Sequence, residues 1–339
     1  MYFRYLLKKY FKSFMLVFIG LSFLYVIVDF MFNYAKLPSS SNLQVLYAFY
    51  VFIYASYTLF PLAIIFGFLL SVSSMIKFNE FVSFYSLGFR PKKLLKPFLI
   101  FALSVTALMY LLQSSKLAYA NQYATSIKEN FNYKTYNLFL KYKNNIVYIK
   151  SINPFSKMAW GIKVFEIKNR KITKVIYAKR AVFENDKWKT KNAEIMTLKQ
   201  NVWQKEQKPL VFLENFTPKI LSNLKTLDNI SFYDAYITIR YFKDIDLNMI
   251  LSIVFFKIFT PLLMIAFLIY LFFTAPIHVR ISNVSLFMIK SVTFSVLLWA
   301  GELLIFKFAK QGILPFWTLA VPFLAIVVID FLVIRRSYD

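Results

Sequence analysis

Residues 45–76 read VLYAFYVFIYASYTLFPLAIIFGFLLSVSSMI and contain no charged side chain. A helix needs about 20 apolar residues to cross a bilayer, so this stretch is long enough to span one. Five other stretches carry few charges: 13–28 (to 35 if Asp29 is tolerated), 98–115, 247–277, 281–306 and 313–334. The sequence therefore predicts six transmembrane helices.

The composition of the 339-residue chain also indicates a membrane protein. Hydrophobic residues make up 59% of it and charged residues 17%, whereas soluble proteins contain about 45–50% apolar residues. The first apolar stretch is not typical of a cleaved signal peptide, because it is too long and no small-x-small cleavage site follows it. We therefore expect it to remain as a transmembrane helix.

A different kind of sequence separates the third apolar stretch from the fourth. Residues 116–248 contain short alternating runs, such as NIVYIK at 145–150 and IKVFEI at 162–167. Alternation with a period of two is typical of strands and not of helices. We expect one antiparallel β domain, of sandwich or jelly-roll type, at 116–248. It is inserted between helices 1–3 (residues 1–115) and helices 4–6 (residues 249–339).

The distribution of positive charge predicts the orientation of the chain. The basic residues assigned to one side are Arg4, Lys8, Lys9, Lys12, Lys77, Arg90, Lys92, Lys93, Lys96, Arg280, Lys290, Arg335 and Arg336. The short loops of the other side hold only Lys36, Lys307 and Lys310. Because the side richer in Lys and Arg faces the cytoplasm, both termini are expected there and the β domain outside.

The chain lacks the motifs of common catalytic and cofactor sites. It has no Cys and one His, His278, and its six glycines form no nucleotide-binding loop. The net charge of +25 is spread among apolar stretches and does not indicate a nucleic-acid binder. The apolar stretches contain only three carboxylates, those of Asp29, Glu302 and Asp330. This small number counts against an ion-coupled pump. We expect no cofactor, no metal and no enzymatic activity in this chain.

A short amphipathic segment lies between the second and third apolar stretches. Phe81, Phe84, Tyr85 and Gly88 recur at helical spacing, and Pro91 ends the pattern. This spacing predicts a helix near residues 78–88 on the cytoplasmic side. Such a helix either anchors the connection at the membrane surface or docks a cytoplasmic motor protein, and the spacing alone does not decide.

Three motifs resemble those of the LptF/LptG permeases of the lipopolysaccharide exporter. Residues 80–95 are similar to that family's acidic residue, short helix, Gly and basic segment next to Pro. AKRAVFENDKW at 178–188 and KIFTP at 257–261 are similar to its signatures in the β domain and the fourth span. The order of parts also resembles the family over essentially the whole chain. Residues 21–30 are more similar to LptG than to LptF.

The resemblance implies a permease subunit of an ABC transporter in the bacterial inner membrane, with its β domain in the periplasm. Such a subunit forms a heterodimer with its paralogue, sits on a dimeric LptB-type ATPase and works with an LptC-like periplasmic bridge protein. The complex extracts lipopolysaccharide from the membrane and passes it to a β-jelly-roll bridge, as a step in outer-membrane biogenesis.

The resemblance also implies two groups of functional residues. The expected ATPase-coupling residues are Glu80, Phe81, Phe84, Gly88 and Arg90. The expected lipopolysaccharide-lining residues are Phe30, Phe32, Lys36 and Lys257. Ordinary explanations stay open for both groups: Glu80 suits a helix N-terminus, Lys36 suits a membrane interface, Lys257 can pair within the protein, and the aromatic rings can face lipid.

Two other functions also stay open on the sequence. A mechanotransmission permease of the FtsX/MacB/LolC kind uses a separate ATPase, but it has four spans and a large domain after the first. A membrane sensor or assembly factor with a periplasmic β domain would need no ATPase. Co-purification with an ATPase whose activity rises on reconstitution would exclude the sensor.

Overall fold

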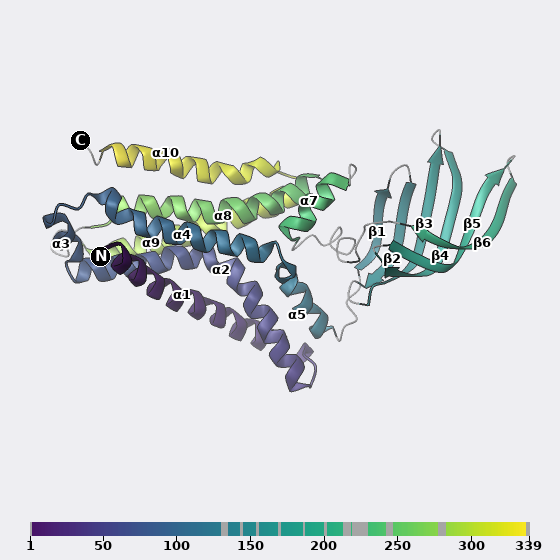
Figure 1. The fold of residues 1–339 in the computed structure, drawn as a ribbon, viewed down its shortest axis with the longest axis horizontal. Helices are drawn as coiled ribbons and strands as arrows, with labels where there is room; N and C mark the ends of the chain where they lie inside the picture. The colour runs from purple at the N-terminus through teal and green to yellow at the C-terminus, as the bar shows by residue number, and fades with distance from the viewer. Residues whose placement is uncertain are drawn as a thin grey trace. The chain divides into compact units, whose positions relative to one another are not determined.

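The computed structural model describes residues 2–129, 135–142, 145–153, 156–168, 171–185, 187–199, 202–212, 218, 230–241, 247–276 and 283–336. His278, Arg280 and Asp186 of the 178–188 motif lie outside the described residues. The chain divides into two compact units (Figure 1). The helical unit comprises Met1–Tyr34, Ala48–Ala120 and Leu251–Asp339, and the β unit comprises Ala35–Tyr47 and Asn121–Ile250.

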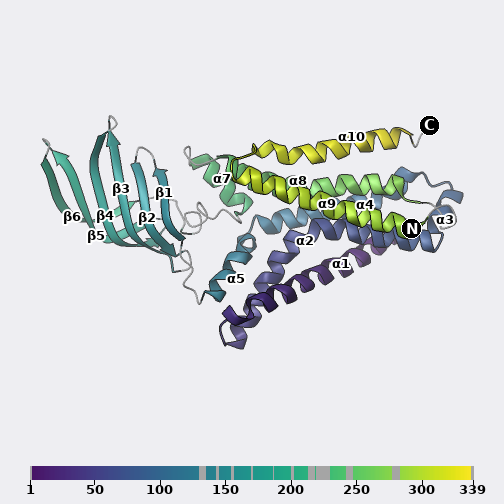
Figure 2. The same ribbon diagram turned by 180° about the vertical axis from the view of Figure 1, so that it is seen from behind.

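Six long apolar helices confirm the predicted number of spans for the part of the chain that the structure describes. They are α1 (Tyr2–Asn33), α2 (Ser41–Lys77), α4 (Pro91–Gln113), α8 (Leu247–Thr274), α9 (Val284–Lys310) and α10 (Val321–Arg336), which forms a span, Phe316–Arg335, together with the short helix that precedes it. Shorter helices are η1 (Tyr34–Lys36), α3 (Glu80–Ser86), η2 (Lys116–Tyr119), α5 (Ala120–Lys128), α7 (Phe232–Tyr241) and η3 (Phe316–Ala320). The N-terminus, α3 and the C-terminal end of α10 lie at the same end of the helical unit (Figures 1 and 2).

The helices α1 and α2 pack at very close range because α2 has a glycine at the contact. A Cβ atom on Gly67 would lie 2.7 Å from the Cα atom of Phe14. One turn earlier in α1, the buried Tyr10 hydroxyl donates a hydrogen bond to the carbonyl oxygen of Ile64 in α2 (2.9 Å). The Tyr10 ring also packs edge-on against Phe101 of α4, with centroids 4.8 Å apart. These contacts give α1, α2 and α4 a common core.

A proline divides α2 into two parts that differ in burial. Pro61 lies inside the helix and, having no N–H, cannot bond to the carbonyl of Tyr57 four residues earlier. Residues 62–65, directly after it, are all buried, whereas most residues from 41 to 59 are half-buried or exposed. The second part of α2 therefore belongs to the core of the helical unit.

The two groups of three helices are joined by contacts between α4 and α8. The Tyr110 hydroxyl in α4 donates a hydrogen bond to the carbonyl oxygen of Ile258 in α8 (2.8 Å). Further along, the rings of Phe98 and Phe272 lie 6.4 Å apart. Segments on either side of the inserted strands thus form one helical core.

The β unit contains one antiparallel sheet, which confirms the predicted β domain between two groups of three helices. Its strands are β1 (Thr135–Tyr142), β2 (Asn145–Asn153), β3 (Met158–Lys168), β4 (Lys171–Glu184), β5 (Lys187–Lys199) and β6 (Val202–Phe212). They pair in chain order (Figure 2), so the described strands form a meander, simpler than the Greek keys of a jelly roll. Within the 178–188 motif, Ala178, Ala181 and Trp188 are buried in the core of this unit.

The close approach at Gly67 predicts that a larger residue at this position disturbs the packing of α1 against α2. Gly67→Ala should lower the melting temperature of the detergent-purified protein, because the new methyl group must displace the backbone of Phe14. Overpacking of this kind costs about 1–3 kcal/mol. Gly20→Ala and Gly301→Ala are matched controls, since nothing lies within 4 Å of a Cβ atom at either position. Equal melting temperatures for all three variants would contradict the described contact.

Candidate functional site

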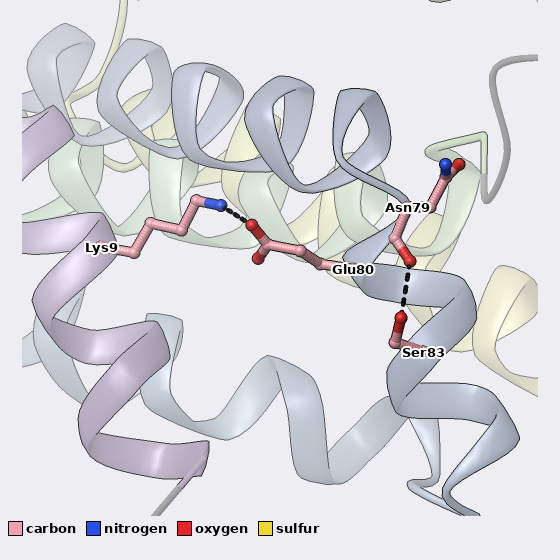
Figure 3. A network of polar contacts seen from close by, with 4 residues as sticks. All are labelled: Lys9, Asn79, Glu80 and Ser83. Carbon is pink, nitrogen blue, oxygen red and sulfur yellow. Dashed lines mark hydrogen bonds and ion pairs between the residues drawn. The ribbon is translucent and has the colours of Figure 1, made fainter.

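The short helix α3 begins at a residue with left-handed backbone conformation. Asn79 has a φ of 55° and lies between the last turn of α2 and Glu80. Asn tolerates this conformation better than most residues. Its carbonyl oxygen accepts bonds from the Ser83 backbone N–H (3.1 Å) and from the Ser83 hydroxyl (3.2 Å; Figure 3). Asn79 therefore lets the chain turn sharply from α2 into α3.

A glycine-dependent cap ends α3 inside the predicted segment 78–88. Gly88 has a φ of 77°, and its N–H donates to the carbonyl of Tyr85 (2.9 Å). The N–H of Phe89 donates to the carbonyl of Phe84 (3.1 Å). This pair of bonds is the Schellman motif, which favours Gly at this position. Arg90 then caps α4, whose first residue is proline.

One face of α3 packs into the helical core. Phe81 is only 3% exposed, and its ring meets that of Phe272 in α8 edge-on, with centroids 6.0 Å apart. Tyr85 stacks on Phe81 (6.3 Å), and burial raises the pKa of its phenol. Phe84 contacts Phe89 (5.7 Å), which in turn lies against Tyr2 at the start of α1 (4.7 Å). The helix is therefore held by both α1 and α8.

An ion pair adds a second connection between α3 and α1. The Lys9 ammonium contacts one carboxylate oxygen of Glu80 (Figure 3). Their side chains are 16% and 19% exposed, and charges so little exposed are costly to leave unpaired. The other carboxylate oxygen of Glu80 is buried. Lys9 also lies over the ring of Tyr5, 5.8 Å from its centroid.

The opposite face of α3 and its flanks are exposed. Phe78, Val82 and Leu87 are 67%, 37% and 73% exposed, and the basic residues Lys77 and Arg90 are exposed beside them. We call these five residues the α3 outer surface. Exposed apolar side chains beside polar ones are typical of a surface that contacts another protein or the membrane.

The structure places the predicted coupling residues at three different positions on and beside α3. Arg90 belongs to the α3 outer surface, and Gly88 forms the end of the helix. Glu80, Phe81 and Phe84 instead hold the helix from its inner face.

Sequence reasoning missed Lys9 as the partner of Glu80. The segment 78–96 contains one acidic residue, and the first twelve residues contain four basic ones. An ion pair could be expected from these charges. The choice of Lys9 over Arg4, Lys8 and Lys12 depends on how α1 is rotated against α3.

The predicted lipid-lining residues lie on α1, η1 and α8. Phe32 is 82% exposed, and Phe30 is half-buried with its ring 5.8 Å from that of Tyr34. Lys36 is exposed at the end of η1, and Lys257 is half-buried within α8. Most of the apolar residues of α1 and α9 are not buried, whereas most of those of α2 are. These two helices thus have apolar surface available for lipid or another subunit.

Comparison with known proteins gives one family match. The family model described as "Lipopolysaccharide export system permease LptF/LptG" matches residues 4–336, nearly the whole chain. The description covers both LptF and LptG. Comparison with curated proteins found no match.

The cap of α3 predicts that substitutions of Gly88 lower the stability of the protein to different extents. Gly88→Ala should lower the melting temperature and increase proteolysis next to α3, since a left-handed conformation costs an L-residue about 1–2 kcal/mol. Gly88→Asn should have a smaller effect because Asn tolerates that conformation, and Gly20→Ala is a neutral control. A Gly88→Ala protein as stable as wild type would contradict the Schellman cap.

Proposed function

The chain belongs to the lipopolysaccharide export system permease family LptF/LptG, and we propose that it is the permease subunit of an ABC transporter that extracts lipopolysaccharide from the inner membrane. As a transporter component, it relies on a separate LptB-type ATPase dimer for ATP hydrolysis. The observation that carries this proposal is the placement of α3, which has an exposed apolar surface and is fixed to two spanning helices.

The α3 outer surface is the proposed contact with the ATPase. Val82 and Leu87 supply apolar area, and Arg90 supplies a charge for an acidic group on the partner. Displacement of α3 is transmitted through Phe81 to Phe272 in α8 and through Glu80 to Lys9 in α1. Movement of one short helix therefore reaches both groups of spanning helices.

The orientation proposed from the sequence places α3 and both termini in the cytoplasm and the β unit in the periplasm. The gathering of the N-terminus, α3 and the end of α10 at one end of the helical unit supports it (Figure 1). Many of the basic residues predicted to face the cytoplasm belong to these elements or the adjoining start of α4. This distribution follows the positive-inside rule.

The β unit is proposed to pass lipid to an LptC-like bridge protein. In the described sheet, β1 and β6 are the edge strands. Edge strands have unpaired main-chain groups that can pair with a strand of another protein. An antiparallel sheet with an available edge therefore suits extension into a bridge of β domains.

The paralogous subunit and the lipid are proposed to share the apolar surfaces of α1 and α9. Lipopolysaccharide combines acyl chains with anionic phosphates, so its path needs apolar walls and cations. Phe30 and Phe32 are the proposed walls on α1, and Lys36 and Lys257 are the proposed cations. The similarity of residues 21–30 favours LptG over LptF for this chain.

Exchanging the two charges of the ion pair tests how α3 is coupled to the ATPase. Glu80→Lys should reduce co-purification with the ATPase and lipid-stimulated ATP turnover without preventing membrane insertion, because two cations then face each other. The loss of a partly buried pair costs about 1–3 kcal/mol, between exposed and fully buried pairs. The double variant Lys9→Glu/Glu80→Lys restores the pair in reverse and should recover most of the coupling.

The outcomes distinguish three roles for Glu80. Recovery in the double variant shows that Glu80 positions α3 through Lys9. No recovery, with normal stability, shows that Glu80 itself contacts the ATPase. Wild-type coupling in Glu80→Lys would show that α3 is only an anchor, and this result would remove the main support for the proposed function.

Photo-crosslinking tests the proposed lipid path. Crosslinkers placed at Phe30, Phe32 and Lys36 should capture lipopolysaccharide in an actively transporting complex, because these positions are the proposed walls and cationic rim. Phe294 and Leu297 of α9, which are 59% and 60% exposed, are comparison positions that report whether the lipid also contacts α9. Failure of all three α1 and η1 positions in an active complex would exclude this path and leave the transporter assignment intact.

A further inference from the structure

A pocket of about 850 Å³ lies on β4, β5 and β6 of the β unit. Small-molecule sites commonly enclose about 300–1,000 Å³, so this pocket is large enough for a sugar. Val182 pairs with Lys189, and Lys189 pairs with Val211. These three residues therefore form one row across the sheet, on the face that lines the pocket.

A β-bulge shapes the middle of the pocket. Thr190 pairs with Leu210 and Ala193 with Lys208, so Lys191 and Asn192 together stand opposite Pro209. Pro cannot donate a ladder hydrogen bond, which favours an irregularity at this point. Both Lys191 and Asn192 are exposed.

The bulge is fixed to the neighbouring strand by a buried hydroxyl. The Thr190 side chain, in a residue that is 5% exposed, donates to the carbonyl oxygen of Arg180 (2.9 Å). It also lies 3.3 Å from the carbonyl oxygen of Asn192. The displaced segment is thus held in place next to β4, and Lys191 has a defined position beside Arg180.

The charged lining of the pocket is mostly basic. It comprises Lys179, Arg180, Lys189, Lys191 and one acid, Glu184. A carboxylate oxygen of Glu184 lies 3.7 Å from the ammonium nitrogen of Lys189, and the two side chains are 61% and 42% exposed. The Arg180 guanidinium contacts the uncharged Met158 sulfur (3.0 Å). The pocket lining therefore has a net positive charge, which a multiply charged anion would neutralise.

We propose that this pocket binds the phosphate-bearing sugar of the exported lipid, an inference that rests on the proposed function. A phosphate group suits the basic side chains, because Arg and Lys make charge-assisted hydrogen bonds to phosphate oxygens. The apolar lining of Val182, Pro209 and Val211 suits the C–H face of a sugar ring. Part of the 178–188 motif, Lys179 and Arg180, thereby gains a ligand-binding role beside the core packing of its alanines.

The test uses the full-length chain in nanodiscs and four probes. These are lipopolysaccharide, the same lipid after phosphatase treatment, glucosamine 1-phosphate and inorganic phosphate. Lys191→Glu reverses one charge on the exposed bulge, and Lys163→Glu makes the same change on β3, outside the pocket, at another exposed lysine. Thermophoresis measures affinity, and a photo-crosslinker at Asn192 reports contact without altering any charge.

The proposal expects a selective loss of affinity. Lys191→Glu should weaken binding of the phosphorylated lipid about tenfold, because a charge-assisted contact to phosphate is replaced by repulsion. Lys163→Glu should change it by less than about twofold, as expected for an exposed and distant charge. Phosphatase-treated lipid should bind both variants and the wild type equally. The Asn192 crosslinker should capture the phosphorylated lipid.

Several results would overturn the proposal. Equal losses for Lys191→Glu and Lys163→Glu would show a general charge effect. Competition at Asn192 by glucosamine 1-phosphate or phosphate, without capture of lipid, would assign the pocket to a soluble anion. Failure of the wild-type chain, reconstituted with the ATPase and the paralogous subunit, to export any lipopolysaccharide would instead reject the proposed function itself.

Discussion

The approach of α1 to α2 at Gly67 is the contact on which the helical unit depends. Lipid tails are as apolar as leucine, so helices in a membrane associate through close packing and buried hydrogen bonds. Gly67 allows the backbone of Phe14 to come near, and the Tyr10 hydroxyl finds an acceptor at Ile64. Lys9 directly precedes Tyr10. When α1 packs on α2, Lys9 faces Glu80. The contact at Gly67 therefore also determines where α3 is held.

The two connections of α3 differ in their physical character. The contact between Phe81 and Phe272 is apolar and independent of salt, whereas the pair of Lys9 and Glu80 is electrostatic and only partly shielded from water. The aromatic contact joins α3 to α8, and the ion pair joins it to α1. A protein bound to the α3 outer surface would thus act on the two groups of helices through two separate contacts.

Features that depend on local sequence were predictable, and those that depend on helix rotation or strand register were not. The apolar run 45–76 and the alternation in NIVYIK predicted a span and a strand because periodicity is a local property. Gly88 and Pro91 predicted the end of α3 for the same reason. The partner of Glu80 required the rotation of α1. Alternation gives strands but not their neighbours, so neither the meander order nor the bulge opposite Pro209 could be read from the chain.

Pro61 removes one of the backbone hydrogen bonds that resist bending of α2. Bending a continuous helix stretches its hydrogen bonds on the convex side, but at Pro61 the bond to the Tyr57 carbonyl is already missing. Residues 62–65 are locked in the core, while the Tyr57 side chain ties the preceding part of α2 to η2 by donating to the carbonyl of Leu117 (2.9 Å). Tilting that first part at Pro61 therefore strains one backbone hydrogen bond fewer than in an uninterrupted helix. The bending stiffness of α2 is thus reduced at the boundary between its less buried first part and its buried second part.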